Sequence, residues 1–266
     1  MSDYWQKRAL ADEALAHRSA QQTAAQVQKV YQRQYDIIMN DMAQLYAQMQ
    51  AGQTPTRTQL WNFTRWKRLE SDLSAFSTKT SKQFVTMLTN SLNGVFKQVI
   101  GVDMSRYLGD NAVHITGDPT TAVNTTWSGE CFSARIWQNN AAIAQRIETD
   151  IQDMIVGGRS ISEVRRKVMQ DFSVAYSDAQ RLVHTEHAYV ANNAAKQRYK
   201  AAGLTKVKWC AVAESDKTCE ICRERHGKVW VMGTEPSMPA HPNCRCVWQG
   251  VVELPGETVE ADGEIV

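Results

Sequence analysis

The residues best suited to chemistry lie in two short motifs, Cys219-Glu220-Ile221-Cys222 and, after 18 intervening residues, His241-Pro242-Asn243-Cys244-Arg245-Cys246. Thiols and imidazoles at this spacing are typical zinc ligands, because tetrahedral zinc is usually held by two short hooks from separate turns. The first hook offers two thiolates. The second offers His241, Cys244 and Cys246, one ligand more than the tetrahedron needs. The pattern predicts a structural zinc site with these five residues as candidate ligands.

The sequence does not decide which residues of the second hook bind the metal. In an extended strand Cys244 and Cys246 project to the same side, so both can approach it. Buried free thiols and a disulfide are alternative states of the cluster. A reducing compartment favours metal over disulfide, and the N-terminus lacks the apolar stretch of a signal peptide, so we expect a protein made in a cytosol.

The N-terminal hundred residues have the pattern of long helices. Apolar residues between Tyr31 and Met49 recur at helical spacing, and so do those of 58–76 and 80–100. Each apolar stripe needs a cover, which the neighbouring helices can supply. Turn-forming residues and a threonine-rich stretch follow in 101–133, which we interpret as a loop or linker.

The second half changes from helical to strand periodicity. We expect a helix from about 134 to Gly157, a short helix that starts at the capping box of Ser160 and Glu163, and another over 177–203. After Gly203 apolar residues alternate with polar ones, which predicts half-buried strands. These strands are expected at 207–211, 229–232 and 245–252.

Together these patterns predict an α+β fold that is predominantly helical, in which a helical segment leads into a small antiparallel sheet with a zinc site. We expect a helical region over 1–100, a linker over 101–133, a domain over 134–252 and an acidic tail over 253–266. Because so small a sheet has little core of its own, a structural metal would contribute to its stability.

Charge and hydropathy narrow the possible partners only slightly. The net charge is +2, and residues 251–266 contain five acidic and no basic residues, so the rest of the chain carries about +7. This balance permits a surface that faces DNA without requiring one. No window approaches the roughly 18 apolar residues of a membrane span, so none is expected.

Five elements, in this order and spacing, resemble the C-terminal domain of Mu F-like phage head morphogenesis proteins. They are Arg181 to Glu186 on a helix, Lys208-Trp209, Asp216 to Cys222, His226 to Trp230, and His241 to Cys246. The resemblance is strong over about 130–250. Besides the five candidate ligands, its motif positions are Arg181, Glu186, Trp209, Asp216, Gly227 and Arg245.

The resemblance implies a minor structural head protein of a tailed phage, not an enzyme. Such a protein is attached to the portal protein inside the capsid and acts in head morphogenesis, with DNA packaging or ejection as further roles. Phage DNA and the major capsid or scaffolding proteins are further candidate partners. The implied location is the virion, after assembly in the host cytoplasm.

Two other functions are compatible with single features. His184-x-Glu186 followed by a C-x-x-C is similar to the signature of zinc-dependent nucleobase deaminases, in which a glutamate shuttles protons beside a metal-bound water. However, no proline precedes Cys219, and His184 lies within a helix. A zinc-containing DNA-binding or nuclease-like module is the second alternative, because basic residues surround the hooks. A nuclease would need a second, catalytic metal site, and no such constellation is evident.

Overall fold

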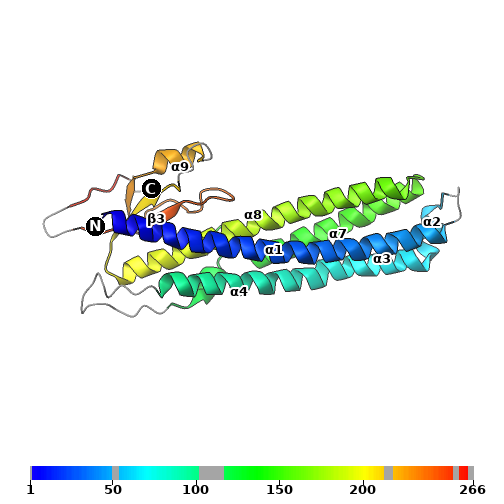
Figure 1. Ribbon diagram of the computed structural model, residues 1–266, viewed down its shortest axis with the longest axis horizontal. Coiled ribbons are helices and arrows are strands. Elements are labelled where there is room, and N and C mark those ends of the chain that lie inside the picture. Colours follow the sequence, from blue (N-terminus) through cyan, green and yellow to red (C-terminus); the bar gives the residue numbers. More distant parts are fainter. Residues whose placement is uncertain (1, 50–53, 102–116, 213–217, 254–257, 263–266) are drawn as a thin grey trace. The chain divides into compact units, whose positions relative to one another are not determined.

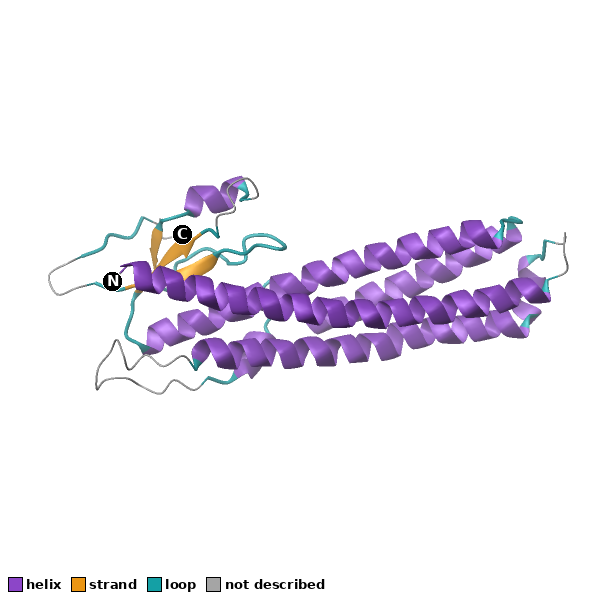
Figure 2. Cartoon of the chain, viewed as in Figure 1, coloured by secondary structure: helices purple, strands orange, loops and turns teal. Residues whose placement is uncertain are grey.

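The computed structural model describes residues 2–49, 54–101, 117–212, 218–253 and 258–262. Figures 1 and 2 show long helices and a small sheet. The described elements are α1 (Ser2–Gln48), α2 (Arg57–Asn62), α3 (Thr64–Ala75), a π-helical turn η1 (Phe76–Thr80), α4 (Ser81–Ile100), α6 (Pro119–Val123), α7 (Phe132–Val156), α8 (Ile161–Ala201), β1 (Lys206–Cys210), α9 (Glu220–Arg225), β2 (Val229–Val231) and β3 (Val247–Val251). The predicted fold class, predominantly helical with a small antiparallel sheet, is confirmed.

The chain forms two compact units, each built from separate segments. The sheet unit comprises residues 1–23, 89–125 and 181–266, and the helical unit comprises 24–88 and 126–180. Each of the four regions expected from the sequence is one continuous segment, so they divide the chain differently from these two units. That division remains a prediction.

The helical unit is held by apolar stripes at helical spacing. Ile38, Met42 and Leu45 of α1 are fully buried, as the stripe from Tyr31 to Met49 predicts. Further fully or nearly fully buried side chains come from the other helices of this unit, among them Leu60, Leu69, Leu73, Phe76, Ile147, Ile151, Val164 and Val168.

A buried polar network lies inside this apolar core. The Tyr31 hydroxyl donates to Asn140 Oδ1 at 2.6 Å, and Asn140 Nδ2 donates to the Ser81 hydroxyl at 3.0 Å. Burial raises the pKa of Tyr31, so its hydroxyl keeps its proton. The polar groups of these three buried side chains therefore form hydrogen bonds with one another in place of water.

The sheet has the order β2-β1-β3 and is antiparallel throughout. Trp209, Trp230 and Trp248 meet edge to face at its centre, with the rings of Trp209 and Trp248 5.1 Å apart. Helix α8 closes the outer edge of β3. Its Asn192 side chain accepts from the Trp248 amide at 2.9 Å and donates to the Cys246 carbonyl at 3.0 Å, which imitates a neighbouring strand.

A buried ion pair joins α1 to α8 in the sheet unit. The Arg198 side chain is 0% exposed, and it donates to Asp12 Oδ2 and to the Val99 carbonyl, both at 2.6 Å. One residue further along α1, Glu13 accepts from Arg245 at 2.6 Å. The first turns of α1 are thus connected both to α8 and to the second cysteine hook.

Two helices differ from the sequence-based expectations. The two helices expected at 160–172 and 177–203 form one helix, α8, because buried Phe172, Ala175 and Ala179 continue its apolar face through the expected break. Helix α1 begins far before Tyr31. Four of the ten buried positions described before Tyr31 are alanines, which give no strong apolar pattern; they are Ala9, Ala16, Ala20 and Ala24.

The described part of the connection between the first and second halves also contains structure. Residues 101–133 were expected to form a loop or linker, and residues 102–116 lie outside the described range. Within the rest, Asp118 caps the short helix α6, and α7 begins at Phe132. The linker over 101–133 therefore stays a prediction.

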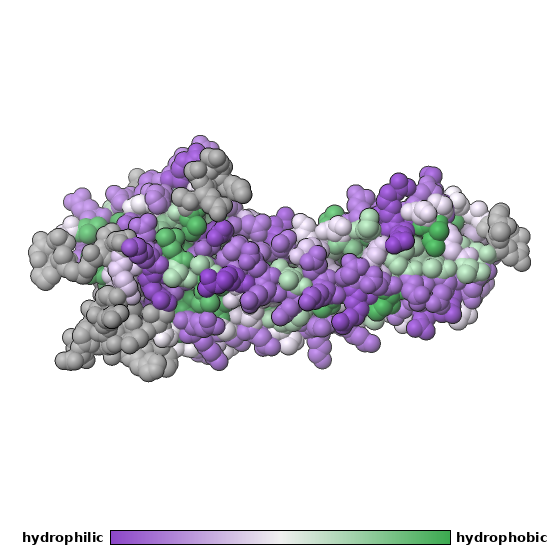
Figure 3. Space-filling model, in the orientation of Figure 1, coloured by the Kyte–Doolittle hydropathy of each residue, from purple (hydrophilic) through white to green (hydrophobic). Residues whose placement is uncertain are grey.

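Hydrophilic residues cover much of the visible surface in Figure 3. They belong largely to the outer faces of helices whose inner faces form the cores. None of the described helices is both long and apolar enough to cross a bilayer.

The buried ion pair generates a first prediction. Asp12→Asn removes the carboxylate charge that compensates Arg198, so we expect the free energy of unfolding to fall by about 3–5 kcal/mol. Urea denaturation followed by circular dichroism measures this. Asp36→Asn, an exposed position on the same helix, is the matched control and should cost less than about 0.5 kcal/mol. Equal stability of the two variants would contradict the role given to Asp12.

Candidate metal centre

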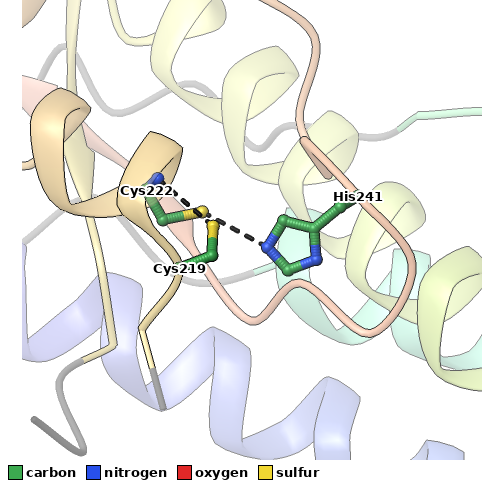
Figure 4. A group of neighbouring side chains, drawn as sticks. All are labelled: Cys219, Cys222 and His241. Carbon is green, nitrogen blue, oxygen red and sulfur yellow. Dashed lines mark hydrogen bonds between the residues drawn. The ribbon is translucent and has the colours of Figure 1, made fainter. Parts of the chain in front are cut away.

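The first hook is formed by the start of α9. Cys219 is the N-cap residue, and its Sγ accepts from the Cys222 amide at 3.4 Å. A thiolate at an N-cap is stabilised by the free amides of the first turn. The C-x-x-C spacing thus becomes a helix start that places both thiols side by side, and Figure 4 shows them directed toward His241.

The second hook brings His241 to this pair. Its Nε2 lies 3.5 Å from Cys222 Sγ, while its Nδ1 lies 2.8 Å from the Pro242 carbonyl. A carbonyl can only accept, so Nδ1 carries the proton and Nε2 offers a lone pair toward the thiols. This backbone contact is the kind of outer support that orients metal-binding imidazoles.

Cys222 is shared by two groups of potential ligands among the described residues. Cys219, Cys222 and His241 form one group, and Cys222, Cys244 and Cys246 form the other, with the ligand atoms of each group within 4.8 Å of one another. The Cys222 and Cys244 sulfurs are 3.7 Å apart. On one tetrahedral zinc, two sulfurs lie about 3.8 Å apart, and a sulfur and an imidazole nitrogen about 3.6 Å. The observed separations of 3.7 and 3.5 Å fit that geometry.

The second hook is fixed from outside by the two long helices of the sheet unit. The Asn243 amide donates to the Thr185 hydroxyl at 3.1 Å, and Asn192 donates to the Cys246 carbonyl. Arg245 projects between the two cysteines to reach Glu13. Asn243 has a φ of 61°, which turns the chain between His241 and Cys244. The second hook is therefore held by contacts that do not involve a metal.

The electrostatics of the cluster favour a bound cation. A hydrogen bond from the Cys246 thiol lowers the pKa of Cys244 to about 5, and the same shared proton raises the pKa of Cys246. Burial raises the pKa of Cys222 to about 12. Crowded thiols of this kind resist carrying several negative charges together, and a soft divalent cation would relieve that repulsion. The residues present can hold such a metal ion.

Comparison with known proteins gives one family. Residues 145–249 match the family model described as Phage Mu protein F like protein. This segment is similar to Mu F-like proteins. The resemblance seen in the sequence is confirmed over those residues, which include both hooks, and it suggests a phage head morphogenesis protein of a structural kind. No match was found among curated proteins or among solved structures.

The structure separates the motif positions of the Mu F-like segment into different surroundings. Trp209 is buried in β1, Gly227 has a positive φ of 84° in the turn before β2, and Arg245 pairs with Glu13. Arg181 is exposed on α8, and Glu186 is buried there. Asp216 lies outside the described residues.

The histidine and glutamate of the deaminase-like pattern do not meet the hooks. Within the described ranges, neither potential metal group contains His184 or Glu186. The His184 ring instead lies 5.3 Å from the ring of His17, and burial lowers its pKa. A deaminase would need the histidine as a ligand and the glutamate beside the metal-bound water. This arrangement disfavours that reading.

Sequence reasoning missed the residues that hold the hooks in place: Glu13, Thr185 and Asn192. Each belongs to a long helix; Thr185 falls within the element from Arg181 to Glu186 but was given no role, and Glu13 and Asn192 belong to no motif. Asn192 gives the clearest signal, because asparagine is unfavourable within helices unless its side chain has a partner. Such a residue, placed in a helix that precedes a small sheet, could have been assigned to the edge of that sheet.

The shared position of Cys222 generates a second prediction. Cys222→Ala should abolish the thiolate-to-metal absorption of added Co²⁺, because it removes a ligand from both groups at once. Cys131→Ala, which changes a partly exposed thiol of the helical unit, should leave the spectrum unchanged. Titration with Co²⁺ under reducing conditions measures both variants. An unchanged spectrum in Cys222→Ala would show that the cluster is not the metal centre.

Proposed function

We propose that the chain is a minor structural head protein of a tailed phage, attached to the portal inside the capsid and acting in head morphogenesis and in DNA packaging or ejection. The observation that carries this proposal is the Mu F-like match over 145–249. In this proposal the protein is part of the virion, it is assembled in the host cytoplasm, and the capsid or scaffolding proteins are neighbours.

We further propose that zinc is the metal and that Cys219, Cys222, His241 and Cys244 are its four ligands. The short separations from Cys222 to His241 and to Cys244 support this set. Cys246 is then the thiol that hydrogen-bonds to Cys244 and orients it. Four protein ligands close the tetrahedron and leave no position for a substrate or a reactive water, which supports a structural role.

A structural zinc would contribute where apolar packing is scarce. The ion would tie the start of α9 to the loop that precedes β3, two segments joined by a sheet of three short strands. Because the second hook is already anchored on α1 and α8, the ion would also attach α9 to those helices. Its function in the protein is therefore to fix the fold of the sheet unit.

The ligand set generates a third prediction. The purified chain should contain about one zinc, and Cys244→Ala should lose it together with part of the thermal stability. Cys246→Ala is the matched variant and should keep the ion with about 10–100-fold weaker affinity, because an outer hydrogen bond is lost and not a ligand. Metal analysis and competition with a chromogenic chelator measure both. Loss of zinc in Cys246→Ala with retention in Cys244→Ala would exchange their roles.

Attachment to the portal generates a fourth prediction. The full chain should co-sediment with assembled portal rings, and we expect the helical unit to carry this contact, since long amphipathic helices can offer faces to a partner. If so, chelation of the metal should leave co-sedimentation unchanged while it loosens the sheet unit. Binding that disappears with the metal would place the contact in the sheet unit. Absence of binding by the intact chain would contradict the portal as partner.

Contact with DNA through the zinc module is supported less well. Arg225 lies over the Trp209 ring, and Arg245 is paired with Glu13. Arg223 donates to the Thr218 carbonyl at 3.0 Å, so three of the basic residues near the hooks already have partners within the protein. Arg223 and Lys228 are nevertheless exposed and could reach phosphates, so we keep phage DNA as a secondary partner.

A further inference from the structure

The two outer edges of the sheet are closed by different means. β3 is covered by Asn192 and Tyr199 of α8, whose side chains bond the backbone of Cys246 and Trp248. β2 has no helix side chain in such a role among the described contacts. One edge of β2 pairs with β1. At its other edge, the amide and the carbonyl of Val229 point away from the sheet.

A piece of the acidic tail occupies that outer side. The Val229 amide donates to Asp262 Oδ2 at 3.1 Å, and the Asp262 amide donates back to the Val229 carbonyl at 2.9 Å. This reciprocal pair resembles the paired bonds of an antiparallel ladder, with one carboxylate oxygen in place of a carbonyl. Asp262 therefore takes the place of a paired strand residue beside Val229.

A second anchor holds the same segment above β1. Lys206 Nζ donates to the Val259 carbonyl at 2.6 Å and to Glu253 Oε1 at 2.7 Å. The Val259 amide in turn donates to Glu253 Oε1 at 3.0 Å. The ammonium group thus binds both the segment and the acidic residue that precedes it in the chain.

These contacts are polar and bury little apolar surface. In segment 258–262 only Val259 is partly buried, and the other four residues are exposed. With little hydrophobic stabilisation, detaching the segment costs much less than opening the tryptophan-filled sheet beneath it. Detachment would leave the amide and carbonyl of Val229 unpaired on a strand edge, which is a ready template for another strand.

We propose that the outer edge of β2 is an exchangeable strand-docking site, and that its partner in trans is segment 258–262 of a second copy of this chain. A second copy supplies every group that the edge already binds, namely the Asp262 carboxylate and amide and the Val259 carbonyl. Lys206 offers the complementary charge to the acidic segment. Exchange of identical segments between copies is a low-cost route to association, because no new interface is needed.

Two complementary variants test the exchange. The acceptor lacks residues 258–266 and so has a vacant edge. The donor carries Val229→Pro, which removes the outward amide but no bond to β1, so its own edge binds the segment more weakly than the edge of the acceptor does. Each variant alone should sediment as a monomer, whereas an equimolar mixture should form a 1:1 heterodimer in analytical ultracentrifugation. A mixture that stays monomeric over the whole concentration range would overturn exchange between copies.

A peptide assay keeps the proposal testable if the proline variant folds poorly. A fluorescent synthetic peptide with the sequence of residues 258–266 should bind the acceptor, and should bind the full chain at least about tenfold more weakly, because the tethered segment competes at high effective concentration. An Asp262→Ala peptide should lose binding, whereas a Glu260→Ala peptide with the same charge change should retain it. No binding to the acceptor, or equal binding of the two altered peptides, would contradict the assigned site.

Discussion

A buried guanidinium group sets the main constraint on the sheet unit. Arg198 has no access to water, so its charge has to be met inside the protein, and Asp12 is the carboxylate that meets it. This requirement fixes the first turns of α1 against α8. Once α1 is held there, Glu13 is in place to bind Arg245, and Arg245 lies between two cysteines of the second hook. The position of the second hook thus depends on the ion pair that neutralises the buried charge of Arg198.

The cysteine cluster shows how a small sheet obtains a unique structure. The three tryptophans of the sheet pack against one another, and side chains of α8 form hydrogen bonds with the backbone at the outer edge of β3. The hooks contribute what apolar packing cannot, namely a directional attachment of α9, a helix of only six residues. A metal bound there would connect short segments that have few other stabilising contacts with each other. The long helices need no metal for their stability, because each buries a long apolar stripe against its neighbours.

Much of this organisation could be predicted from residue types and spacing. The fold class, the strands and the proximity of Cys219, Cys222 and His241 follow from local patterns, and the structure agrees with them. The start of α1 could not be predicted, because buried alanines leave only a weak apolar signal. The continuity of α8 was missed because Ser177 and Asp178 favour a helix start locally, whereas buried neighbours decide the outcome. The partners Asp12 and Arg198 are 186 residues apart, and no local rule connects such positions.

The segmented composition of the sheet unit has a consequence for biosynthesis. Residues 1–23 leave the ribosome first, yet their partners in this unit lie in 89–125 and 181–266. Asp12 can pair only after Arg198 has been synthesised, and Glu13 only after Arg245. This unit therefore cannot fold completely until its last segment has been made. A metal bound by both hooks would also be captured after the helices are made, since His241 and Cys244 follow them in the sequence. A nascent chain that has not yet reached these residues would hold the helices and an incomplete sheet, so closure of the metal centre would follow the assembly of the helices.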